Sequence, residues 1–235
     1  MKKILTVIAL LMLVGTMQAQ RQVTTFLGIP VDGTKAEMKR KLVAKGFTPK
    51  TLGDTEWLEG EFNGRDVQLG IVTNNNKVYR IAVVDKDRTD ETEIRIRYNN
   101  LISQFEANSR YETASAQPID EDTDISYEMT CKNKNFQAVF VQSSGTQDTD
   151  IETLAKDIKV ELAKKFTAEQ LANPTTDEKI EIENIKSSAA NKLAEQRTQS
   201  MLKRLVWFRI VEDSGEYVIA IYYDNGYNKA NGEDL

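Results

Sequence analysis

Residues 56–85 read EWLEGEFNGRDVQLGIVTNNNKVYRIAVVD and contain two turns between runs of alternating apolar and polar residues. Asn63-Gly64 is the pair that a two-residue hairpin turn favours, because both of its central residues need positive φ angles. Residues 67–71 then alternate in polarity, and residues 74–76 are all asparagine, which marks a second turn. The stretch therefore predicts an antiparallel meander of three strands, with the third strand carried by residues 79–83.

A helix is expected on each side of this meander. Before it, Thr34 and Glu37 have the spacing of a capping box, and Gly46 is placed to end the helix. After it, Asp90 can cap a second helix, in which Glu93 and Arg97 can pair four residues apart. Apolar side chains recur at helical spacing in both segments, so each helix has one face to bury.

A second meander is predicted further along the chain. Residues 125–131 alternate as a strand would, with Cys131 on the apolar face, and residues 136–140 continue the pattern. Residues 204–225 read as a hairpin with its turn at 213–215. Cys131 could be a reactive thiol, but a cysteine on an apolar strand face behaves as a small hydrophobic residue, so we expect Cys131 to be part of the core.

The region 146–203 interrupts the second meander. It has no glycine, and residues 148–203 hold 11 acidic and 9 basic residues with one aromatic, Phe166. Apolar residues recur at helical spacing on both sides of Asn173-Pro174, and Thr176 can cap the second helix. The pattern predicts a charged helical hairpin that packs mainly on itself, although a hairpin lying over the sheet fits the same residues.

These elements predict an α+β fold of two helix-plus-antiparallel-meander units, with the charged helical hairpin inserted in the second. The antiparallel-sheet domain comprises 21–145 and 204–235, its two units are 21–108 and 109–235, and the insertion is 146–203. A meander with one apolar face has to be covered, and its own helix is the nearest cover. The two units can then join their sheets side by side.

Residues 1–20 have the pattern of a secretory signal peptide. Lys2 and Lys3 precede an apolar run over 4–14, and a small-residue exit follows. The run is too short to span a membrane, which takes about 20 residues. We therefore expect a periplasmic or secreted protein with no integral membrane segment after signal removal.

Composition excludes several classes of function. The chain has no histidine and one cysteine, which removes Ser-His-Asp and Cys-His catalysis and nearly every zinc arrangement. The formal net charge of −5 argues against nucleic acid, whose phosphates need clustered Lys and Arg. No catalytic residue, metal ligand or cofactor is assigned from the sequence.

The aromatic residues are the candidate binding residues. The tail after the last strand superficially resembles a calcium loop, but it has Lys229 where that loop needs glycine. The tail is better read as the turn that leaves the strand, with Tyr222, Tyr223 and Tyr227 forming a rim suited to an interface. Trp57 lies near Glu59 and Glu61 on one strand face, as in a sugar site, although alternating charge on an exposed strand is the commoner explanation.

Three stretches carry a resemblance. FLGIPVDGTKAEMKRKLVAKGF (26–47), EGEFNGRDVQLGIVTNNNKVYRI (59–81) and YVIAIYYDNGYNKANGEDL (217–235) resemble uncharacterised exported proteins of Bacteroides-type bacteria. That resemblance implies export and brings no activity or site residues. The doubled helix-plus-meander is also similar, in architecture alone, to the tandem fold of beta-lactamase inhibitory proteins and small outer-membrane assembly factors. It implies a sheet face that binds protein.

Three hypotheses of function follow. The first is an exported, non-enzymatic protein that presents its sheet face, or the helical arm, to another envelope or extracellular protein. The alternative is a carboxylate-based hydrolase acting on glycan or peptidoglycan, with Glu59 and Glu61 as the acid pair. The third is a structural or storage protein that binds no small ligand.

Overall fold

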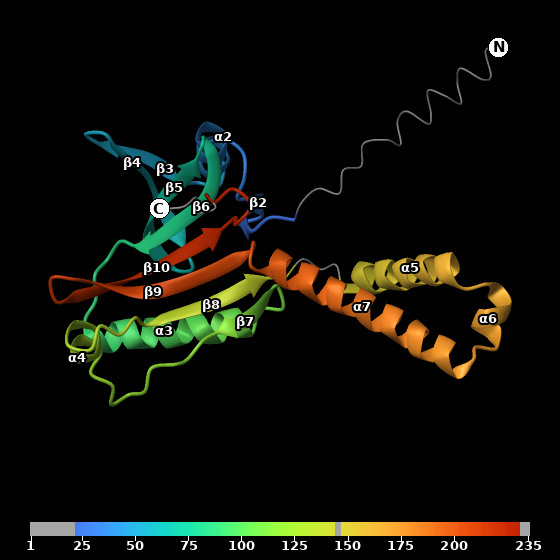
Figure 1. Ribbon diagram of the computed structural model, residues 1–235. Coiled ribbons are helices and arrows are strands. Elements are labelled where there is room, and N and C mark those ends of the chain that lie inside the picture. Colours follow the sequence, from blue (N-terminus) through green and yellow to red (C-terminus); the bar gives the residue numbers. More distant parts are fainter. Residues whose placement is uncertain (1–21, 144–146, 231–235) are drawn as a thin grey trace, which may run out of the picture.

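The computed structural model describes residues 22–143 and 147–230, and its main element is an eight-stranded antiparallel sheet (Figure 1). The strand order is β3-β4-β5-β6-β10-β9-β8-β7, and a two-stranded hairpin, β1-β2, stands apart from it. The strands are β1 (Thr25–Phe26), β2 (Ile29–Pro30), β3 (Thr48–Leu52), β4 (Thr55–Phe62), β5 (Arg65–Asn74), β6 (Lys77–Asp85), β7 (Tyr111–Ser115), β8 (Gln137–Gln142), β9 (Leu205–Asp213) and β10 (Glu216–Asp224). The helices are α2 (Lys35–Val43), α3 (Glu91–Glu106), α4 (Ile125–Thr130), α5 (Gln147–Lys165), α6 (Ala168–Ala172) and α7 (Thr176–Met201).

Each half of the sheet is one meander, and the two halves join through their last strands. β6 and β10 pair antiparallel, with Val83 opposite Ile221 and Ala82 opposite Tyr222. The strand order therefore runs 3-4-5-6 and then 10-9-8-7, which relates the halves by an approximate two-fold axis at the β6–β10 seam. The predicted fold class, α+β with two helix-plus-meander units, is confirmed.

Two helices cover one face of the sheet. α2 packs against β5 and β6, and α3 packs against β7, β9 and β10. α3 thus covers strands of the second unit, although the sequence-based boundary at 109 placed it in the first. The core lies between these helices and the sheet, and Tyr98, Phe140 and Phe208 are among its largest fully buried side chains. Removing such aromatic surface from water is the main favourable term of the fold.

The predicted caps and turns are present. The Thr34 hydroxyl accepts a hydrogen bond from the Glu37 N–H, and the Glu37 carboxylate accepts from the Thr34 N–H, which completes the capping box of α2. Asn63 and Gly64 have φ angles of 53° and 71°, as the β4–β5 turn requires. These local predictions succeeded because each rests on the backbone geometry of a few neighbouring residues.

The prediction of a strand over residues 125–131 is wrong. Ile125–Thr130 form the short helix α4, and the Asp124 carboxylate caps it by accepting from the Tyr127 N–H at 2.7 Å. Only Ile125 of this helix is buried, and Cys131 is exposed rather than part of the core. An alternating run of seven residues with an Asp at its start suits a helical turn as well as a strand, and here the cap decides the conformation.

Two edge strands were missed by the sequence reading. β3 pairs with β4, so the first meander has four strands rather than three. β7 pairs with β8, and it supplies the second meander with the strand that residues 125–131 were expected to form. All five residues of β3 are exposed, so the strand has no alternation of polarity by which it could be recognised.

The ion pair predicted within α3 has a different partner. Arg97 lies 3.2 Å from the Asp85 carboxylate of β6 instead of pairing with Glu93, and both side chains are at least 90% buried. The Glu93 N–H donates to Asp90, which caps the helix as expected. Arg97 therefore ties α3 to the β6–β10 seam rather than stabilising its own helix.

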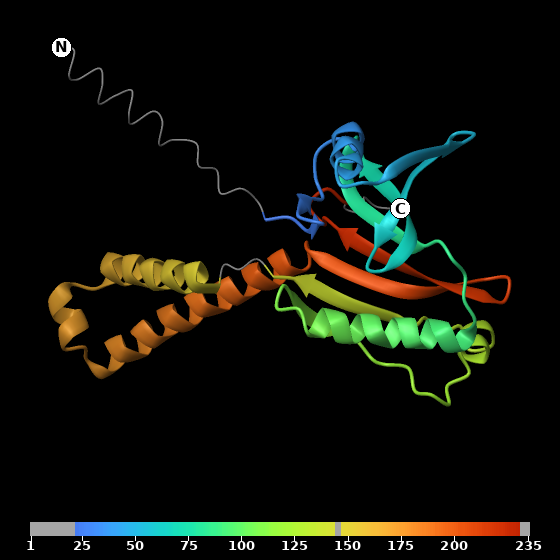
Figure 2. The same ribbon diagram turned by 180° about the vertical axis from the view of Figure 1, so that it is seen from behind.

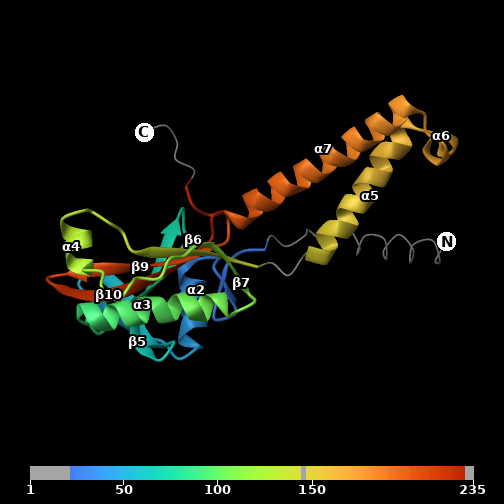
Figure 3. The same cartoon turned by 90° about the horizontal axis from the view of Figure 1, so that it is seen from below.

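α5, α6 and α7 form an arm inserted between β8 and β9, and it projects away from the sheet (Figures 1 and 2). α5 and α7 pack on each other, and α6 connects them at the end far from the sheet (Figure 3). The N-cap of α7 is Thr175, one residue before the predicted Thr176, and Glu178 completes its capping box. This is the predicted hairpin packed mainly on itself.

The predicted signal peptide, residues 1–20, lies outside the described residues. Within residues 22–143 and 147–230, no helix is both long and apolar enough to cross a membrane.

Candidate binding face

The sheet presents very different residues on its two faces. Along β10, Ile219, Ile221 and Tyr223 point to the helix-covered side and are buried. Tyr222 points the opposite way and is half-buried. This second face, on the side away from α2 and α3, is termed the open face.

A row of uncharged side chains crosses the open face. Cross-strand pairing places Gly70 of β5 opposite Ala82 of β6, Ala82 opposite Tyr222, Tyr222 opposite Trp207 of β9, and Trp207 opposite Val139 of β8. Since neighbouring strands lie about 4.8 Å apart, the five residues extend over about 19 Å. The open face therefore has an uncharged band across its middle.

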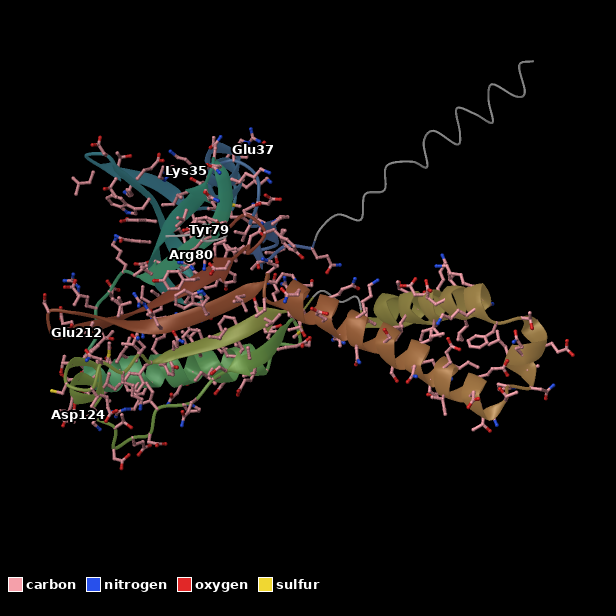
Figure 4. All side chains as sticks on the ribbon, in the orientation of Figure 1. Lys35, Glu37, Tyr79, Arg80, Asp124 and Glu212 are labelled. Atoms are coloured by element: carbon pink, nitrogen blue, oxygen red, sulfur yellow. The ribbon has the colours of Figure 1, made fainter. Side chains whose placement is uncertain are left out.

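Trp207 and Tyr222 of this band form one stacked cluster with Arg80, which lies beside the band on β6. The Trp207 and Tyr222 rings are stacked with centroids 4.1 Å apart. The Arg80 guanidinium lies 5.2 Å from the Trp207 ring and 4.8 Å from the Tyr222 ring, which is cation–π distance. Figure 4 shows Arg80 on β6, in the middle of the body between α2 and the end that carries Glu212.

Asp224 holds the cluster in place. Its carboxylate accepts two hydrogen bonds from Arg80, at 2.6 and 2.7 Å, and a third from the Trp207 indole N–H at 3.1 Å. The hydrogen bond to Asp224 raises the pKa of Arg80 above its ordinary value, so the guanidinium stays charged. Because the charge of Arg80 is neutralised by a largely buried carboxylate, the cluster offers rigid aromatic surface with little net charge.

The predicted Trp57 lies on the open face, but its acidic neighbours do not form a catalytic pair. The Glu59 carboxylate accepts from the Trp57 indole N–H at 3.1 Å and lies 3.3 Å from the Lys86 ammonium. The hydrogen bond from Trp57, with a smaller contribution from Lys86, lowers the pKa of Glu59. A general acid needs a raised pKa, whereas the pKa of Glu59 is lowered, so Glu59 is unsuited to that role. Glu61 lines a different hollow from Glu59.

The three tail tyrosines do not form one rim. Tyr222 belongs to the open face, whereas the adjacent Tyr223 is only 4% exposed and packs against Phe26, with ring centroids 4.9 Å apart. Tyr227 is half-buried beyond the end of β10, and its N–H donates to Asn225. The alternation of a strand separates Tyr222 from Tyr223, so only Tyr222 joins the candidate site.

The tail after β10 has a structural role, because Asn225 and Gly226 bind other segments of the chain. Asn225 is fully buried, and its side-chain amide donates to the Val31 carbonyl at 2.7 Å. The Gly226 N–H donates to the Lys203 carbonyl, and a side chain at Gly226 would meet the Lys203 Cα at 2.9 Å. The tail is therefore tied to the N-terminal segment and to the base of the arm, as a turn leaving the last strand.

Comparisons with known proteins found no match: no family model, curated protein or solved structure matches the chain. Among the residues described, no three acidic, cysteine or histidine side chains gather as a metal site would require.

Sequence reasoning missed the two residues that organise the open face, Arg80 and Trp207. Trp207 alternates with buried Val206 and Phe208 in a visible strand pattern, so its outward orientation could have been read from the sequence. Its contact with Arg80, which lies 127 residues earlier in the chain, could not, because it depends on the pairing of β6 with β10.

Proposed function

We propose that the chain is an exported, non-enzymatic binding protein whose open face engages another envelope or extracellular protein. The observation that carries the proposal is the stacked cluster of Trp207, Tyr222 and Arg80 on the uncovered side of the sheet. Trp, Tyr and Arg are the residue types most enriched where protein interfaces derive their binding energy. Export is supported by the pattern of residues 1–20.

Pre-organisation supports binding by this face. Asp224 accepts hydrogen bonds from both Arg80 and Trp207, so these side chains are held in one arrangement before a partner arrives. Binding then costs less entropy than it would if these side chains were mobile, because each mobile side chain costs about 0.5–1.5 kcal/mol to immobilise. The lowered pKa of Glu59 and its pairing with Lys86 give the hydrolase hypothesis no support.

The test uses immobilised protein and an envelope extract from the native source. Wild type is compared with Tyr222→Ala and with Tyr127→Ala, a matched control because Tyr127 is an exposed tyrosine on α4. We expect wild type and Tyr127→Ala to retain the same partner, and Tyr222→Ala to bind the purified partner at least about 30-fold more weakly, as for an interface hot spot.

A form in which residues 144–202 are deleted separates the two candidate surfaces, and it keeps Lys203, whose carbonyl accepts from the tail. If the open face is the contact, this form keeps the partner. The proposal fails if Tyr222→Ala and Trp207→Ala bind as tightly as wild type while the arm-deleted form loses the partner, because the arm would then be the contact.

A further inference from the structure

An apolar pocket of about 330 Å³ lies on the helix-covered face, near the seam between the two units. Ile221 and Tyr223 of β10 line it from the sheet, and Leu101 and Phe105 line it from α3. Phe62, at the end of β4, adds a third aromatic ring. Pockets for small molecules occur preferentially between structural units and begin at about this volume.

The rim of the pocket is polar but carries little charge. The Asn63 side-chain amide donates to the Gln104 side-chain carbonyl at 2.9 Å, which links the β4–β5 turn to α3. This bond leaves the Asn63 carbonyl as an acceptor and the Gln104 amide as a donor at the edge of an apolar space. Glu61 is the only charged residue among the lining residues, and no Lys or Arg is present. The lining therefore disfavours anions.

A strained leucine lies at the pocket. Leu27 lines it from the β1-β2 turn, with a φ angle of 50° and 40% of its surface exposed. The left-handed region is costly for residues other than Gly, Asn and Asp, and Gly28 beside it already has a φ angle of 78°. Asparagine would suit this turn better, and it would not expose an apolar side chain. Strained residues of this kind cluster at ligand sites.

We propose that this pocket binds an uncharged, mostly apolar small molecule, about the size of two fused rings, with Leu27 closing over it and the rim amides orienting one polar group. A cavity of about 150 Å³ holds benzene, so a space twice as large accommodates a bicyclic body. The aromatic rings of Phe62 and Phe105 offer edges and faces for such a body.

This site is independent of the proposed function. Ile221 and Tyr223 project from β10 to the side opposite Tyr222, so the pocket and the open face lie on different sides of the sheet. Loss of partner binding and loss of pocket binding are therefore separable outcomes.

The first measurement compares two probes with nearly the same ring system. N-phenyl-1-naphthylamine is uncharged, whereas 1-anilinonaphthalene-8-sulfonate carries a sulfonate, and both become fluorescent in apolar surroundings. We expect one equivalent of the uncharged probe to bind with a dissociation constant of about 100 µM or lower. The anionic probe should bind at least about tenfold more weakly. Equal or tighter binding of the anionic probe would overturn the proposal.

The second measurement locates the probe. Gln104→Trp places an indole at the rim, and Ser103→Trp is the matched control because Ser103 is exposed on the same helix turn but does not line the pocket. We expect Gln104→Trp to weaken binding of the uncharged probe at least about tenfold and Ser103→Trp to leave it unchanged. Equal affinity in both variants would show that the probe binds elsewhere.

Leu27→Asn distinguishes a ligand contact from a structural one. Relief of strain at the turn should raise the midpoint of thermal unfolding by about 2–4 °C. Loss of the apolar side chain should nevertheless weaken binding of the uncharged probe several-fold. If Leu27→Asn lowers the unfolding midpoint, or binds the probe as tightly as wild type does, then Leu27 is not part of a ligand site and the proposal is wrong.

Discussion

The sheet body and the helical arm differ sharply in what they bury. The body has one continuous core, in which Tyr98, Phe140 and Phe208 are fully buried. Among arm residues whose exposure is described, Phe166 and Ile182 are the buried apolar side chains, and Ile180 is 58% exposed. The arm therefore has little apolar burial to stabilise it.

Local interactions take the place of a core in the arm. Thr175 and Glu178 cap α7 reciprocally, and Lys165 of α5 pairs with Glu181 of α7 at 2.7 Å. Caps contribute about 1 kcal/mol and exposed ion pairs still less. One chain therefore contains two regions of different stability, and the arm should open without unfolding the sheet.

The largest expected effect is in the body. Phe208→Ala removes a ring that stacks on Phe105 and Phe140 and meets Tyr98 edge-on, with centroid distances between 5.2 and 6.1 Å. We expect the free energy of unfolding, measured in urea, to fall by about 3–5 kcal/mol because of lost burial and the remaining cavity. Val160→Ala in the arm, at a half-exposed position, is the control and should change it far less. Equal losses would remove the distinction between the two regions.

Alkaline pH should lower the free energy of unfolding of the sheet body, because its buried tyrosines ionise more readily in the unfolded chain. Burial raises the pKa of Tyr98 to about 12 from an ordinary value of 10. Below pH 10 the side chain is neutral in both states and its stabilising contribution is complete, whereas between pH 10 and 12 only the unfolded chain ionises. The free energy of unfolding should therefore fall over that range.

Tyr98→Phe should flatten this alkaline slope, which urea titrations at pH 9, 10 and 11 would measure. Part of the slope should remain, because burial also raises the pKa of Tyr223 well above its ordinary value. Tyr127→Phe, at an exposed position, should leave the slope unchanged. A Tyr98→Phe slope identical to that of wild type would contradict the assignment.

Loss of the cap on α7 should be a smaller and local effect. Thr175→Ala removes the hydroxyl that accepts from the Glu178 N–H, at a cost of about 1 kcal/mol. Hydrogen exchange should become faster in α7 while protection in β9 and β10 stays the same. Equal acceleration of exchange in α7 and in the strands would mean that arm and sheet unfold together.

The smallest expected effect on the sheet comes from removing the arm. The Gln142 N–H donates to the Arg204 carbonyl at 2.9 Å, so the chain ends left by deletion of 144–202 already lie together. A two-residue turn can join them, and the free energy of unfolding of the sheet should change by less than about 1 kcal/mol. A large loss would show that the arm supports the strands.

The parts of the fold that sequence predicted are those fixed by neighbouring residues. Thr34 with Glu37 and Asn63 with Gly64 specify their conformations within four residues, so they could be read directly. The prediction of a strand over Ile125–Thr130 was wrong because these six residues fit both a strand and a helix. The cap formed by Asp124 is the feature that distinguishes the two. β3 was not predicted because an exposed edge strand has no apolar pattern.

The candidate site was only partly predictable. Trp57 and Tyr222 were singled out from the sequence and lie on the open face, but Tyr223 was grouped with Tyr222 although strand alternation sends it into the core. Arg80 was missed because its role depends on Asp224, 144 residues away. The pocket was missed because its walls come from five separate segments of the chain, and only the unusual Leu27-Gly28 turn hints at it.

The place of β10 at the centre of the sheet has a consequence for biogenesis. β10 follows every other strand along the chain, yet it lies between β6 and β9. While the polypeptide is being synthesised, β6 keeps an unpaired edge, and unpaired strand edges invite aggregation. The two meanders cannot join into one sheet until residues 216–224 have been synthesised.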